Sequence, residues 1–243
     1  MSYWRAARMR PVAATARFAA AIGVLLSAFC AAAFAEPADA ENEATRCPDG
    51  ATWHTESDPA RHAVNALVPG RVGWCEQDGK RHGPMRLWWP SGALMREVHF
   101  ERGAETGRLA SFFEDGRPEL ETRQREGKVE GRFVLWHKNG QKARDMTYEA
   151  GRPHGWATYW DESGRLLSRG AWADGKKEGV WETLHGNGVL KEVARWESGR
   201  LSGRQLVFNE GGRFVSGACW QDGERRWESK NEAETRTRKC LPW

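Results

Sequence analysis

Glycine and apolar residues recur along this chain with a period of 24 residues, beginning near residue 72. The first glycine series contains no insertion: Gly79, Gly103, Gly127, Gly151, Gly175, Gly199 and Gly223. A second series follows four residues later: Gly83, Gly107, Gly131, Gly155, Gly179 and Gly203. A third series completes the period: Gly92, Gly116, Gly140, Gly164, Gly188 and Gly212. Self-similarity at one fixed period is typical of a repeat architecture.

Each 24-residue unit is expected to contain a β-hairpin. Small polar residues or glycine precede the third series: Ser91, Asp115, Asn139, Ser163, Asn187 and Gly211. Such dipeptides supply the positive φ angles of primed hairpin turns, so we expect the primed turn here and a second glycine turn at G-x-x-x-G. About six residues between the two turns form the first strand, with a recurrent bulky position: Trp88, Phe112, Trp136, Trp160, Leu184 and Phe208. Alternation as in Leu190, Ala194 and Trp196 predicts a second strand, buried on one face.

Two strands per unit predict an all-β antiparallel meander in a single layer. Leucine-rich repeats and parallel β-helices have similar periods, but the leucine consensus is missing, and a β-helix does not explain two glycine turns per unit. Strands pair at ~4.8 Å, so equivalent residues of neighbouring units should stand ~9.6 Å apart. One such column predicts an aromatic core along one face: Phe100, Gln124, Tyr148, Trp172, Trp196 and Trp220.

The residues that precede the array predict export. The first 35 residues hold Arg5, Arg8, Arg10 and Arg17, no acidic residue, and an apolar run that ends at Phe34. This is the composition of a secretory signal peptide, with cleavage expected after Ala35 and the periplasm or the extracellular space as destination. The expected organisation is a signal peptide (1–35), a flexible acidic linker (36–46), an N-terminal cap (47–71), the repeat array (72–227) and a C-terminal cap (228–243).

Four cysteines remain after cleavage, which predicts two disulfides in an oxidising compartment. Cys75 and Cys219 occupy the same register six periods apart. In an open ladder that is ~58 Å, so they cannot bond to each other. We therefore expect Cys47–Cys75 and Cys219–Cys240, each tying a flank to a terminal strand. Free or intermolecular thiols are the alternative.

Units such as Gly155–Trp160 followed by Ser163-Gly164, and Gly179–Trp181 followed by Asn187-Gly188, resemble MORN repeats. The similarity covers residues 72–227 and is closest to the bacterial MORN-2 variety, which is also found in YwqK-type antitoxins. The resemblance implies an elongated, twisted, single-layer antiparallel sheet of about six hairpin repeats that serves as a binding or scaffolding surface, without shared catalytic residues. The signal peptide and the cysteines depart from what a cytoplasmic antitoxin would need.

No catalytic, metal or cofactor site is expected, and we predict a protein that is not an enzyme. The G-x-S-x-G and H-E-x-x-H motifs are missing from the sequence. His82 and His154 share a register three units apart, or ~29 Å, and His137 and His185 are ~19 Å apart. Neither pair can share a metal ion.

Two sets of residues are candidate binding surfaces. The candidate binding face comprises tryptophans that either pack in the core or anchor a partner: Trp136, Trp160, Trp172, Trp196 and Trp220. The second set, the basic column, comprises Lys80, Lys128, Arg152, Lys176 and Arg200. It either follows an anionic polymer or lipid, or is a solvated edge that is partly neutralised by Glu105, Glu130 and Glu178.

Charge removes one class of partner. Loss of the signal peptide leaves 37 − 4 = 33 basic residues against 33 acidic ones, so we expect no nucleic-acid partner. A protein partner is the first hypothesis. A glycan or anionic lipid of the cell envelope is the alternative, and a YwqK-like antitoxin or immunity protein is a further one.

Overall fold

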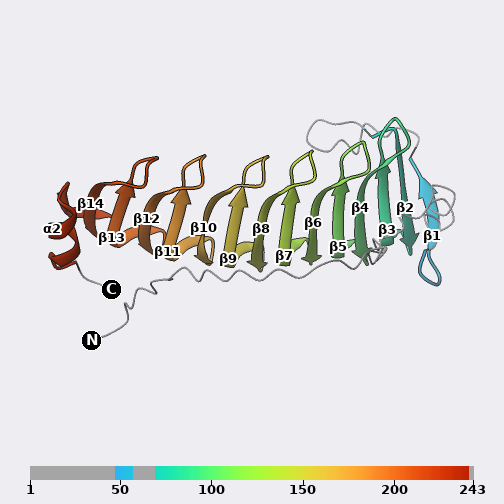
Figure 1. The fold of residues 1–243 in the computed structure, drawn as a ribbon. Coiled ribbons are helices and arrows are strands. Elements are labelled where there is room, and N and C mark those ends of the chain that lie inside the picture. The colour runs from blue at the N-terminus through green and yellow to red at the C-terminus, as the bar shows by residue number, and fades with distance from the viewer. Residues whose placement is uncertain (1–46, 57–68, 241–243) are drawn as a thin grey trace, which may run out of the picture.

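The computed structural model describes residues 47–56 and 69–240, and the predicted signal peptide and linker lie outside these ranges. The described residues form one open antiparallel sheet in which each strand pairs with its neighbours in sequence (Figure 1). The strands are β1 (Thr52–Thr55), β2 (Arg71–Gln77), β3 (Lys80–Trp88), β4 (Leu94–Glu101), β5 (Ala104–Phe112), β6 (Pro118–Arg125), β7 (Lys128–Trp136), β8 (Lys142–Glu149), β9 (Arg152–Trp160), β10 (Leu166–Ala173), β11 (Lys176–Leu184), β12 (Leu190–Glu197), β13 (Arg200–Phe208), β14 (Phe214–Gln221) and β15 (Glu224–Ser229). A short helix, α2 (Glu232–Thr237), follows β15. The predicted ladder of hairpins is confirmed.

The primed turns lie at the first glycine series, not at the third as the dipeptides had suggested. Asp78 and Gly79 both have positive φ (52° and 71°), as a type I′ turn requires, and the equivalent turns repeat this. At Asp115-Gly116, only the glycine has positive φ. Its N–H donates to the Phe113 carbonyl, and the Asp115 carboxylate accepts from the N–H of Arg117. In five of these longer loops an aspartate or asparagine side chain accepts a backbone N–H: Asp115, Asn139, Asp161, Asn187 and Asn209.

The second glycine of G-x-x-x-G belongs to a strand and not to a loop. β3 begins at Lys80, three residues before Gly83, so the first strand of the unit is longer than the predicted six residues. A register shift occurs here, because Trp74 pairs with Met85 whereas Glu76 pairs with Arg81. The glycine therefore sits in a bulge, with a φ of 101°.

The bulge glycines face the aromatic column of the next strand. Gly83 pairs with Phe100, Gly155 with Trp172, and Gly203 with Trp220. Glycine is needed here for the positive φ of the bulge, because a Cβ at Gly131 or Gly179 would meet nothing within 4 Å. The second glycine series therefore sets the backbone conformation opposite the aromatic column.

Hydrogen bonds along both edges join each unit to the next. On the edge of the primed turns, the turn glycine donates its N–H to a carbonyl of the preceding unit, as from Gly103 to Arg81 and from Gly151 to Val129. On the other edge, the side-chain amides of Asn139 and Asn187 donate to carbonyls 23 residues later. Hydrogen bonds therefore join neighbouring units at both edges of the sheet as well as along the strands.

The two faces of the sheet differ in role. We call one the core face, because it holds both hydrophobic clusters: one around Met85 and Val98 near β3–β5, the other around Met146, Ala157 and Trp181 near β8–β11. The opposite side, which includes the pairs Arg86–Glu97 and Trp156–Ala171, is the outer face. A single layer encloses a core here because large side chains fold over small ones on their own face.

Disulfides fasten the flanks to the two ends of the ladder. Cys47 bonds to Cys75 and Cys219 to Cys240, with Cα–Cα distances of 5.5 and 5.6 Å, as the cysteine spacing had predicted. At the β1 end, the Trp53 ring fills the space that a Cβ of Gly73 would need, and Thr235 of α2 does the same over Gly217. The caps therefore cover the terminal parts of the outer face, and no other described segment packs over the strands between them.

Candidate binding surface

The five tryptophans of the candidate binding face divide between the two faces of the sheet. Strand pairing places Ala171 opposite Trp156, so the next residue, Trp172, points to the other side, into the core face. Trp196 and Trp220 occupy the same register as Trp172, opposite Gly179 and Gly203. Trp136 and Trp160 lie on the outer face, because they are four residues from Arg132 and Trp156 on the same strands, at the ends of β7 and β9. All five are half-buried.

The core face is filled by its own rings. Trp181 is 4% exposed, and its indole N–H donates to the Ala171 carbonyl at 2.8 Å. Its ring stands perpendicular to that of Trp172, with the ring centroids 5.3 Å apart. The Lys177 ammonium lies over the Trp181 and Trp196 rings, at 4.4 and 4.7 Å, and burial lowers its pKa. The rings of β10–β12 are engaged with one another, which is the behaviour of a core.

The outer face carries the most exposed aromatic side chain of the described residues, Trp156, which is 67% exposed. Val180 lies in the equivalent position one unit later and is 49% exposed. These two residues, with Thr158, Arg169 and Glu182, line a hollow of about 410 Å³ across β9–β11. We call this the apolar hollow. An exposed apolar patch of this kind, bordered by charged groups, is typical of an interaction site.

Nearer the N-terminus, the same face is ionic. Arg86 pairs with Glu97 at 2.6 Å, and Arg108 with Glu121 at 3.1 Å. Arg132 pairs with Asp145 at 2.6 Å, and this hydrogen bond lowers the pKa of the Asp145 carboxyl group. Alternating charges therefore cross the strands in a row on the outer face, each pair supporting the strand pairing beneath it.

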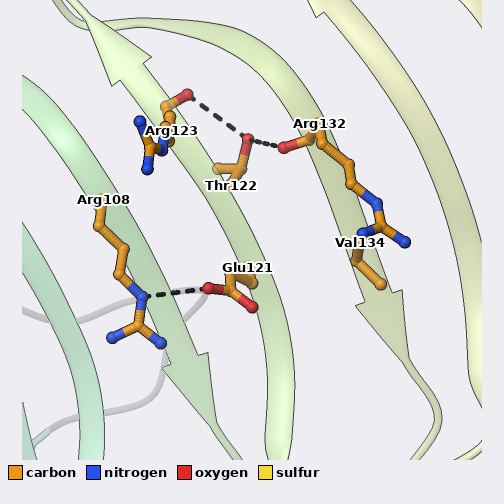
Figure 2. Close-up of a pocket in the computed structure, with 6 residues that line it drawn as sticks. All are labelled: Arg108, Glu121, Thr122, Arg123, Arg132 and Val134. Atoms are coloured by element: carbon orange, nitrogen blue, oxygen red, sulfur yellow. Dashed lines mark hydrogen bonds and ion pairs between the residues drawn. The ribbon is translucent and has the colours of Figure 1, made fainter.

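Part of this row surrounds a second hollow of about 290 Å³, which we call the basic hollow (Figure 2). Its lining comprises Arg108, Glu121, Thr122, Arg123, Arg132 and Val134. Figure 2 shows Glu121 paired with Arg108, while Thr122 bonds to the backbone carbonyls of Arg123 and Arg132. The lining of the basic hollow therefore includes three guanidinium groups and one carboxylate.

Comparison with known proteins identifies the repeat. The family model of the MORN repeat variant matches residues 81–102, which span most of β3, the following loop and β4. The chain contains a MORN repeat. The other units share the strand lengths and turn conformations of the matched one, and we call the strands β3–β14 the MORN array. No curated protein matches the chain.

The basic column forms an exposed row on one edge of the MORN array. Each residue of the column begins an odd-numbered strand, directly after a primed turn, and is exposed. The Lys128 stem lies 3.5 Å from where a Cβ of Gly151 would stand, and Lys176 lies 3.4 Å from that of Gly199. Arg152 and Arg200 are opposite Glu149 and Glu197 in the strand pairing, so carboxylates accompany the cations along the edge.

Two of the three carboxylates expected to neutralise the basic column, Glu130 and Glu178, have another contact. Glu130 and Glu178 accept hydrogen bonds from the backbone N–H groups of Ala150 and Ser198, in the next primed turn. They cap turns at positive-φ residues. Their place in the MORN array is therefore structural.

The histidines of the MORN array also bond to neighbouring units. His137 Nε2 lies 3.0 Å from the Trp160 carbonyl oxygen, and His185 Nε2 lies 2.9 Å from that of Phe208. His82 Nδ1 accepts from the Arg102 N–H, and His54 stacks on Trp74. The remaining histidine of the N-terminal flank, His62, lies outside the described residues.

Within residues 47–56 and 69–240, no group of three histidine, cysteine or acidic side chains is placed to hold a metal ion. The helices in the described part of the chain are too short or too polar to cross a membrane.

Sequence reasoning left Trp156 out of the candidate binding face, although one signal pointed to it. The column to which it belongs reads Pro84, Arg108, Arg132, Trp156, Val180 and Arg204. Tryptophan and valine interrupt a column that is otherwise mainly arginine. An apolar residue at a position that its neighbouring units fill with charge is a sign of exposure.

Proposed function

We propose that this MORN-repeat protein is an exported scaffold, without catalytic activity, that binds another protein through its outer face. The observation that carries the proposal is the exposure of Trp156 and Val180 on a sheet whose other described tryptophan, tyrosine and phenylalanine rings are buried or half-buried. Tryptophan is among the residues that dominate protein interfaces, and an exposed one costs more as free surface than a polar residue would.

The position of the caps supports the same surface. Trp53 and Thr235 cover the outer face at β2 and β14, and both disulfides hold these flanks in place. The strands between them have an outer face that no other described segment covers. Stable disulfides also fit the oxidising compartment to which the arginine-rich leader would direct the chain.

Photo-crosslinking tests the proposal. A benzophenone amino acid replaces Trp156 in the full chain, and a matched variant carries it at Lys176, which is exposed on the edge. We expect a discrete, protease-sensitive adduct from position 156 in cells that produce the protein, and none from position 176. No adduct at position 156, or one that survives protease and contains carbohydrate, would contradict protein binding.

A glycan or anionic lipid of the envelope remains the second candidate, because five exposed cations lie along one edge. It predicts that Lys128→Glu with Lys176→Glu releases the protein from phosphatidylglycerol vesicles or from envelope polysaccharide. The outer-face proposal predicts that this double variant still gives the adduct at position 156. No observation of the structure favours the antitoxin role that the YwqK-type resemblance would imply.

A further inference from the structure

The basic hollow and the apolar hollow are the same structural site, two units apart. Arg108, Glu121, Arg132 and Val134 line the first, and the residues 48 positions later are Trp156, Arg169, Val180 and Glu182, which line the second. The backbone therefore builds one concave site repeatedly on the outer face. Only the side chains change, from a pair of arginines to a tryptophan and a valine.

The basic hollow has an excess of cationic groups. Glu121 pairs with Arg108 and Asp145 with Arg132, whereas the Arg123 guanidinium has no ion pair within the described residues. Arg123 stands directly opposite Arg108 in the pairing of β5 with β6. Like charges at such positions destabilise a sheet, and an added anion would relieve the repulsion.

The carboxylate that strand pairing places opposite Arg123 already accepts a hydrogen bond from another group. Glu130 pairs with Arg123 in the register of β6 and β7, but its Oε2 accepts the Ala150 N–H at 2.8 Å. The Arg108–Glu121 pair is half exposed on both sides, so it is weak enough to rearrange around an incoming carboxylate. The arginine fork matches the geometry of a carboxylate, which is the anionic group of an unmodified polypeptide side chain.

We propose that the partner presents an acidic and apolar polypeptide segment, with a carboxylate at Arg123 in the basic hollow and an apolar side chain against Trp156 and Val180. This inference rests on the proposed function and names the chemistry of the segment that occupies the outer face. The centres of the hollows, β6 and β10, are four strands apart, or ~19 Å. An extended chain covers that span with about six residues.

The surroundings of Trp156 favour a polypeptide over a polysaccharide. The hollow that Trp156 shares contains the aliphatic side chain of Val180, and Ala171 is its partner in the strand pairing. A sugar ring would stack on the indole but would leave these aliphatic groups without a partner. An apolar side chain such as leucine would cover all three.

Fluorescence anisotropy with defined peptides tests the proposal on the full, disulfide-bonded chain. The probe carries a Glu-Glu-Glu cluster about six residues from a Leu-Leu pair, made with the cluster on either side of the pair. Control peptides replace glutamate by glutamine, or leucine by serine. We expect both replacements to weaken binding, and the affinity for the acidic probe to fall as salt is raised.

Protein variants locate the contacts. Arg123→Glu and Trp156→Ala should each raise the Kd about tenfold or more, because each removes one of two anchors. Arg123→Gln, which removes the charge without reversing it, should have a smaller effect in the same direction. Arg200→Glu makes the same charge change on the edge and should leave the Kd unchanged.

Three results would overturn the inference. If Trp156→Ala weakens the peptide complex but Arg123→Glu does not, the acidic part is wrong while the outer-face proposal stands. If Arg200→Glu weakens binding as much as Arg123→Glu, and heparin displaces the peptide from both variants, the chain binds polyanions in general. If no peptide binds at concentrations up to about 1 mM, the inference of an acidic and apolar segment is rejected. The crosslinking experiment at position 156 would still test the proposed function separately.

Discussion

At the scale of single residues, tryptophan has two roles in this protein, and the strand that carries it decides between them. Trp181 is buried and bonded to a backbone carbonyl, whereas Trp156 lies two strands away and is 67% exposed on the opposite face. The two residues have the same chemistry, but replacement of Trp181 should destabilise the fold strongly and replacement of Trp156 should not. A comparison of the two therefore separates core packing from recognition.

Replacing Trp181 by alanine should lower the free energy of unfolding by about 3–5 kcal/mol, because the change empties the core face around Gly170 and Trp172. Trp156→Ala should change it by less than about 0.5 kcal/mol, because most of that ring is already in water. Urea denaturation followed by circular dichroism measures both. A large loss of stability in Trp156→Ala would show that the outer face is part of the core.

A second prediction at this scale concerns pH. The pKa of Asp161 is lowered from 3.8 to about 2, first because the Ser163 hydroxyl donates to its carboxylate, and also because the Arg165 backbone N–H does. A carboxyl group whose pKa is lower in the folded state adds stability above its unfolded pKa. That stability is lost as pH falls from about 4 to about 2.

Asn209 occupies the same position two units later and accepts the equivalent N–H groups of Gly211 and Arg213. Asp161→Asn should therefore keep the turn and remove part of the acid sensitivity. Thermal unfolding between pH 2 and pH 5 should show a shallower decline for the variant than for the native chain. Parallel declines would mean that the Asp161 carboxylate has no influence on stability.

At the scale of the strand and its turns, glycine serves three separate purposes. Gly79 allows a primed turn, Gly83 allows a bulge, and Gly170 makes room for the Trp181 ring. The first two need a positive φ, and the third needs the absence of a side chain. The 24-residue spacing places Gly79 and Gly83 without telling which purpose each serves, and Gly170 belongs to none of the three glycine series.

Gly170→Ala and Gly179→Ala test this distinction. A Cβ at Gly170 would stand 2.3–2.5 Å from Trp181 ring atoms, so we expect a loss of more than about 2 kcal/mol as the ring is displaced. A Cβ at Gly179 would meet nothing within 4 Å, and only its φ of 68° opposes the change, at about 1 kcal/mol. Equal losses in the two variants would contradict the packing described for Gly170.

At the scale of the whole molecule, the period of 24 residues was sufficient to predict the meander, the number of strands per unit and the pairing of the cysteines. It could not tell which columns share a face. A register shift of one residue beside each longer loop, where Leu135 pairs with Arg144 but Trp136 pairs with Lys142, changes the alternation between a strand and the next. For that reason the sequence grouped Trp136 with Trp172, although they point to opposite sides of the sheet.

Other parts of the molecule left no periodic signal. The short helix α2 carries an asparagine N-cap, Asn231, but it lies outside the repeat, and Thr235 holds it against the sheet through a contact with Gly217. The equivalence of the two outer-face hollows was readable in principle, as residues 48 positions apart. Their exposure depends on where the caps end, which only the folded chain reveals.

The ladder consists of units that add side by side, each lengthening the sheet by the same amount. Small-angle X-ray scattering of the chain without residues 128–151 tests this directly, because the deletion joins Gly127 to Arg152 in the register that Lys128 normally occupies. We expect a folded protein with both disulfides and a maximum dimension that is ~9.6 Å shorter than that of the full chain. A folded variant whose maximum dimension is unchanged would contradict the ladder and the spacing of the two hollows on it.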